Sequence, residues 1–110
     1  MKKMIVIEIP IISPWENKIA PFYLHVENKE RIFKSEVLNL LARLEKENRE
    51  YCEQYNHAVY TDEFVRAADS IKACEDWPTL SKDIRGVNTH ITINGETCSL
   101  CIRRQEIYSL

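Results

Sequence analysis

The segment NTHITINGETCSLCIRR, residues 88–104, holds the residue types in this 110-residue chain that most often carry chemistry. Cys98 and Cys101 form a CxxC spacing, and His90 lies shortly before them. Such a pair can be a metal knuckle, a redox couple or two cysteines that fall in one strand. The secondary structure of the segment decides between these three readings.

Two runs of alternating apolar and polar residues flank Asn94-Gly95, a dipeptide typical of a two-residue hairpin turn because both positions tolerate positive φ. The turn predicts a register with these pairs: Ile93–Glu96, Ile91–Cys98, Thr89–Leu100 and Val87–Ile102. One face is then apolar, and the other carries Asn88, His90, Thr92, Thr97, Ser99, Cys101 and Arg103.

Residues three apart in a strand lie on opposite faces, so Cys98 is predicted to point into the core and Cys101 away from it. The two thiols can then neither chelate one ion nor form a disulfide. The segment therefore indicates two cysteines in a strand, with no metal site and no cofactor.

His90 and Cys101 are predicted neighbours on the polar face, and a thiolate beside an imidazole is in principle a nucleophile. An open sheet face, however, offers no oxyanion hole and does not exclude water. The chain has no GxSxG, HExxH or DxD spacing, and its two glycines cannot form a phosphate-binding loop. We therefore expect no enzyme and no catalytic residues, with a small enzyme centred on His90 and Cys101 as an alternative.

The remaining pattern predicts the elements that position this hairpin. The β-branched run near 3–12 is apolar on both sides, as in a central strand, and a half-exposed strand near 19–27 follows it. Helical periodicity predicts helices near 30–56 and 61–76, with Ser35 and Thr61 as N-caps. The hairpin supplies strands near 87–93 and 96–104, and the tail QEIYSL can extend the last one.

The predicted fold class is α+β. We expect a two-layer sandwich in which a four-stranded antiparallel sheet, with chain order ββααββ, carries two helices on one face. Residues 1–110 are expected to form a single compact domain.

Composition favours a cytoplasmic protein. A hydrophobic content of 45% and a charged content of 29% are ordinary for a folded domain, and the net charge of −2 draws it to neither nucleic acid nor membrane. The basic start MKKMIVIEIP is interrupted by Glu8 and is followed by no cleavage site, and the apolar run is too short for a membrane span. Cysteines are then reduced, although Cys52 and Cys74 could meet where the helices pack.

Asn48 is the unusual residue in the apolar stripe of the first helix. A buried asparagine in a helix–helix seam fixes register and oligomeric state, which would fit a homodimer. Alternatively, the helix extends past its sheet beyond Leu44, which leaves Asn48, Tyr51 and Tyr55 partly exposed. We favour the second interpretation, and a homodimer stays possible.

Acidic residues dominate positions 45–76, with nine acids against four basic residues. The predicted partner-binding residues are Glu47, Glu50, Tyr51, Glu53 and Tyr55 on this acidic helical edge, with His90 and Arg103 on the hairpin face. Tyrosine among charged residues is common at interface centres.

The sequence therefore predicts a non-catalytic protein-interaction module. We expect a small inhibitor or modulator of another protein, including a basic or nucleic-acid-handling one. Phage anti-defence, anti-CRISPR and immunity proteins resemble it in size and character, without a shared motif. The alternative is a small RNA-binding or ribonucleoprotein-associated factor that uses the exposed sheet face with Arg85, Arg103 and Arg104; that face is poor in aromatic and basic residues, so nucleic acid is the less favoured partner.

Overall fold

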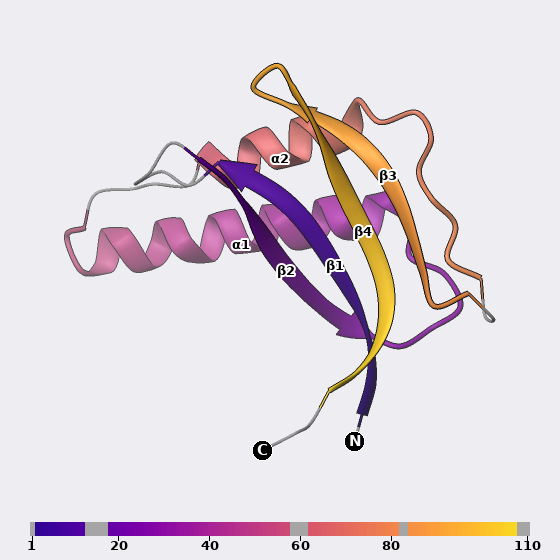
Figure 1. Cartoon of the computed structure of the whole chain (residues 1–110). Coiled ribbons are helices and arrows are strands. Elements are labelled where there is room, and N and C mark those ends of the chain that lie inside the picture. The colour runs from indigo at the N-terminus through magenta and orange to yellow at the C-terminus, as the bar shows by residue number, and fades with distance from the viewer. Residues whose placement is uncertain (1, 13–17, 58–61, 82–83, 108–110) are drawn as a thin grey trace.

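Alternating apolar residues build one sheet, and two amphipathic helices cover its apolar face. The computed structural model describes residues 2–12, 18–57, 62–81 and 84–107. The elements in chain order are β1 (Lys2–Ile12), β2 (Ile19–Glu27), α1 (Lys34–Gln54), α2 (Asp62–Lys72), β3 (Gly86–Ile93) and β4 (Glu96–Ile107). Both helices pack on the same face of the antiparallel sheet, which confirms the predicted α+β class and the order ββααββ (Figure 1).

The sheet order is β2-β1-β4-β3, so the first and last strands lie at its centre. The two faces of β1 are both buried: Ile7 is inaccessible on the helix side, and Val6 is only 2% exposed on the other. The apolar character of both sides of this strand is explained by its central place, as predicted.

The last hairpin has the predicted register, from Val87 opposite Ile102 to Ile93 opposite Glu96. Its turn has φ of 52° at Asn94 and 81° at Gly95. Positive φ at both positions is the geometry that an Asn-Gly turn supplies at low cost.

The two central strands separate at one end of the sheet. Their ladder stops at Glu8 opposite Cys101, although β1 continues to Ile12 and β4 begins at Glu96. Arg104 N donates to Arg85 O at 2.7 Å, so the backbone N–H and C=O groups of Arg104 point toward β3. Because these groups alternate in direction along a strand, even-numbered residues of β4 bond to β3 and odd-numbered residues bond to β1. The next position of β1 that would bond to β4 is Pro10, which has no N–H, and the pairing ends there.

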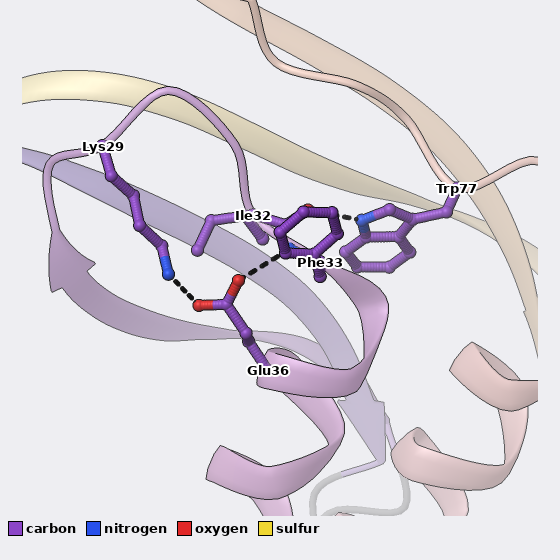
Figure 2. Close-up of polar contacts among 5 residues, drawn as sticks. All are labelled: Lys29, Ile32, Phe33, Glu36 and Trp77. Atoms are coloured by element: carbon purple, nitrogen blue, oxygen red, sulfur yellow. Dashed lines mark hydrogen bonds and ion pairs between the residues drawn. The ribbon is translucent and has the colours of Figure 1, made fainter.

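Helix α1 begins at Lys34 rather than near residue 30, and the predicted cap at Ser35 is wrong because Ser35 lies inside the first turn. The carboxylate of Glu36 accepts the backbone N–H of Phe33 at 3.1 Å and pairs with Lys29 (Figure 2). Trp77 Nε1 donates to Ile32 O at 2.9 Å. These contacts hold the residues before Lys34 in an extended loop.

Helix α2 ends at Lys72, earlier than the predicted 76. The ammonium of Lys34, at the start of α1, donates to the carbonyl oxygens of Lys72 (3.2 Å) and Cys74. A cation at a helix C-terminus donates hydrogen bonds to the last carbonyl groups and interacts favourably with the negative end of the helix dipole. The predicted cap Thr61 lies outside the described residues.

This contact also corrects the suggestion that Cys52 and Cys74 meet. Cys74 lies beside the start of α1, whereas Cys52 lies near the other end of that helix. A rise of about 1.5 Å per residue separates these two ends by roughly 25 Å. Both cysteines are free thiols.

Candidate functional site

The described part of the chain offers two surfaces on which the predicted binding residues lie. The first is the C-terminal end of α1. Val37 and Leu41 are the buried residues of this helix, whereas Asn48, Tyr51 and Tyr55 are exposed. The helix continues past the edge of the sheet (Figure 1), as the favoured interpretation of Asn48 required.

Three rings gather at this end, and we call Tyr51, Tyr55 and His57 the α1 tip. The ring centroids of Tyr51 and Tyr55 are 4.8 Å apart, and His57 lies 6.1 Å from Tyr51 and 6.3 Å from Tyr55. Both tyrosines are 55% exposed. His57 was not among the predicted binding residues. It comes back onto the helix because Asn56 has φ of 56° and His57 N donates to Cys52 O at 2.8 Å. The signal was the asparagine after the last helical turn.

Glutamates surround the α1 tip. Glu47, Glu50 and Glu53 are all exposed, and the ion pairs seen among the described residues do not include them. Arg49, on the same helix, bonds to Glu45 at 2.6 Å, and this hydrogen bond, with a smaller contribution from the charge of Glu53, raises the pKa of Arg49. The structure thus places five predicted residues together: Glu47, Glu50, Tyr51, Glu53 and Tyr55.

The second surface is the sheet face that the helices do not cover. Near its centre, Arg103 pairs with Glu8 at 3.4 Å and donates to Gln105 Oε1 at 3.1 Å. The guanidinium carbon of Arg103 lies 5.8 Å from the ring centroid of Tyr23, which is 45% exposed. An arginine over an exposed aromatic ring forms a cation–π pair that can contact a planar group.

His90 and Cys101 both lie on this face of the hairpin. The register pairs His90 with Ser99 and Cys101 with Asn88, so the two side chains are diagonal neighbours. No hydrogen bond joins them among the contacts of the described residues. His90 is also separated from Arg103 along the hairpin, so the structure does not unite these two predicted residues in one cluster.

The two cysteines of the CxxC occupy opposite faces, as alternation requires, but the predicted contrast between a buried and an exposed thiol is wrong. Cys98 and Cys101 are both half-buried. Cys98 lies where β1 and β4 separate, in a shallow hollow of about 280 Å³ that also contains Glu8, Pro10, Pro21 and Ser99. Over residues 2–12, 18–57, 62–81 and 84–107, no three His, Cys, Asp or Glu side chains are grouped so that they could hold a metal ion.

Arg104 belongs to neither surface. Its guanidinium points to the helix side of the sheet and donates to Asn28 Oδ1 at 2.7 Å, and also to the carbonyl oxygens of Lys29, Glu30 and Ser81. Of the arginines considered for RNA binding, Arg104 is therefore structural and Arg103 is paired with an acid, while Arg85 is exposed.

No helix among the described residues is both long enough and apolar enough to cross a membrane. Comparison of the chain with protein-family models, with curated proteins and with solved structures finds no match.

Proposed function

We propose that this protein is a non-catalytic module that binds another protein through the α1 tip and modulates it. The observation that carries the proposal is the group of three aromatic rings that projects past the sheet on α1, surrounded by exposed glutamates. The exposed parts of these large rings are in contact with water. A partner surface that covered them would bury this apolar area, which is favourable.

The charge around the rings indicates what kind of partner fits. Glu47, Glu50 and Glu53 give this end of α1 a negative charge, of which Arg49 offsets a part through its interaction with Glu53. A basic surface, such as that of a protein that handles nucleic acid, would complement it and would be steered toward it at low salt. Tyrosines at the centre with charges at the rim is the usual arrangement of an interface.

The role that fits best is a small inhibitor or modulator. A compact α+β unit with a projecting acidic helix can occupy the basic surface that its partner uses for another ligand. Phage anti-defence proteins, anti-CRISPR proteins and immunity proteins resemble this protein in size and character. This is a general likeness to these classes of protein, without a shared sequence motif.

A quantitative pull-down from the native host tests the proposal. The baits are the wild type, Tyr51→Ala, Glu50→Lys and Glu53→Lys, with Tyr23→Ala and Glu96→Lys as matched substitutions away from the α1 tip. We expect one captured protein to be lost with the tip variants and kept with the two controls. With the purified partner, Tyr51→Ala should weaken binding about thirtyfold, the loss typical of an interface hot spot.

The control variants also show which results would contradict the proposed binding site. If a prey depends on Tyr23 and not on Tyr51, the interface lies on the open sheet face. If every variant captures the same proteins with equal affinity while its circular dichroism spectrum is that of the folded protein, the proposal is wrong.

RNA binding by the open sheet face is the second candidate, because Arg103 lies over the exposed ring of Tyr23. Stacking on such a pair is how sheet surfaces hold unpaired bases. The ion pair between Arg103 and Glu8 and the structural role of Arg104 both count against it. A salt-dependent shift of single-stranded RNA by micromolar protein, lost in Tyr23→Ala, would favour this function over the first.

A further inference from the structure

We infer that strand β3 is a dimerisation edge, at which a second copy of this chain adds its own β3 in antiparallel orientation and continues the sheet. The inference concerns the edge opposite β2 and does not depend on the α1 tip.

The outer side of the β3 backbone presents a row of donors and acceptors that no other strand of the sheet pairs. Odd-numbered residues of β3 bond to β4, as the bond from Arg104 N to Arg85 O and the register show. The N–H and C=O groups of the even-numbered residues therefore point outward from the sheet, at Gly86, Asn88, His90 and Thr92. All four residues are exposed.

Among the described residues of the segment that precedes β3, no backbone hydrogen bond reaches an outward group of this edge. The segment's described contacts with the sheet are on the helix side: Thr89 Oγ1 donates to Asp76 O at 3.1 Å, and Ser81 O accepts from Arg104 at 3.2 Å. Leu80 is buried in the core below the sheet. Ser70 on α2 donates to Thr92 O at 2.7 Å, which leaves a second lone pair on that carbonyl oxygen.

The sequence of β3, GVNTHITI, lacks the features that normally prevent edge pairing. Monomeric proteins protect a free edge with proline, with lysine or other charges, or with a bulge. The other edge has such protection, because the pairing of Ile9 with Phe22 makes odd-numbered residues of β2 point outward, and Pro21 occupies one of these positions. Strand β3 spans eight residues and has neither proline nor an acidic or basic residue other than His90.

The edge is complementary to itself. An antiparallel arrangement centred on Thr89 pairs Asn88 with His90 of the second copy and Gly86 with Thr92 of the second copy. Every outward position is then used, and each pair exchanges two backbone hydrogen bonds. The Asn88 amide faces an imidazole, a donor–acceptor match, and no like charges oppose one another. Self-complementarity of this kind is the property of a two-fold interface, which is why the occupant is a second copy.

Sedimentation of the wild type over about 1–300 µM tests the inference, and it should show concentration-dependent doubling of the 13.0 kDa mass. His90→Pro removes one outward N–H without touching a bond to β4, and it should raise the dimer dissociation constant at least about tenfold. His90→Ala keeps the N–H and is the matched control, for which we expect an increase of less than about threefold.

Amide hydrogen exchange of the wild type gives a second readout that needs no variant. The amides of Asn88 and His90 should be protected at high but not at low protein concentration, whereas those of Thr89 and Ile91 should be protected at both. If His90→Pro fails to fold, this alternating pattern decides alone. A monomer at all concentrations, a dimer that His90→Pro leaves unchanged, or equal weakening by His90→Ala would each overturn the inference.

Discussion

The guanidinium of Arg104 reaches from β4 to Asn28 Oδ1 at 2.7 Å and so joins the last strand to the loop before α1. The same side chain donates to three carbonyl oxygens, of Lys29, Glu30 and Ser81, at distances between 2.6 and 3.2 Å. One side chain thereby satisfies backbone groups of two loops that the regular ladders do not reach. The helix layer is tied to the sheet at this point.

Arg104→Lys should therefore destabilise the protein although it preserves the charge. A single ammonium cannot reproduce the planar fork that serves four acceptors, so carbonyl groups of both loops lose their partner. We expect a loss of about 2 kcal/mol in the free energy of unfolding, measured by urea denaturation. Arg85→Lys, at an exposed neighbouring arginine, is the control and should change stability by less than about 0.5 kcal/mol.

The Glu36 carboxylate makes stability depend on pH. The hydrogen bond from Lys29, and then that from Phe33 N–H, lowers the pKa of Glu36 below its ordinary 4.5. A lowered folded-state pKa means that the stabilisation is complete above the unfolded-state value and is lost as the pH falls through the folded-state value. Glu36→Gln retains an acceptor for Phe33 but loses the charge.

The free energy of unfolding of Glu36→Gln should accordingly fall below that of the wild type near pH 7, by under about 1 kcal/mol because Lys29 is exposed. The difference should vanish as the pH falls well below 4.5. Urea titrations at several pH values measure it, with Glu30→Gln as the control. A difference that grows on acidification would contradict the assignment.

Sequence reasoning was accurate where the local chemistry determines the structure. The Asn94-Gly95 turn and the alternation around it specify the hairpin register, because a shift by one residue would expose Leu100 and Ile102. It failed at the helix ends. The start of α1 is set by the local contact of Glu36 with Phe33 N–H, which a capping rule includes but which the choice of Ser35 overlooked, and by Trp77, which is remote in the chain. The end of α2 is set by Lys34, which no local capping rule includes.

The binding surfaces were predictable to a similar extent. Helical spacing identified the face of α1 that carries Tyr51 and Tyr55, but His57 joins them through the left-handed conformation of Asn56. The separation of β1 from β4 follows from Pro10, which has no N–H to donate. The sequence does not show whether the backbone of Pro10 faces β2 or β4, so this separation could not be predicted. Arg104 could not be distinguished from a surface arginine, because the loops that it holds come from remote positions in the chain.

A substitution at Asn48 tests whether this part of α1 is exposed or packs against another helix. The side chain of Asn48 is exposed, and Nδ2 donates to Leu44 O at 2.7 Å. A bond to the carbonyl four residues back adds little to a helix, and alanine has the better helix propensity. Asn48→Ala should raise the free energy of unfolding by about 0.5 kcal/mol. A loss of more than about 1 kcal/mol would indicate instead a buried asparagine in a helix–helix seam.

The cysteines test whether the protein is an enzyme. Cys74 is 8% exposed, and its Sγ lies 3.8 Å from Thr89 Oγ1, so it should react most slowly with iodoacetamide in the folded protein. Cys101 is half-buried and makes no hydrogen bond to His90 among the contacts of the described residues. It should react no faster than a free thiol, because an activated cysteine needs a cationic or basic neighbour in contact.

Peptide mapping by mass spectrometry resolves the four thiols over time. His90→Ala should leave the rate at Cys101 unchanged, and Asn88→Ala serves as the control for a substitution on the same face. A Cys101 rate about tenfold above that of a free thiol, reduced by His90→Ala and not by Asn88→Ala, would show that the imidazole activates the thiolate. That result would replace the interaction module with a small cysteine-dependent enzyme, since a fast thiolate on an open sheet face has no structural reason to exist.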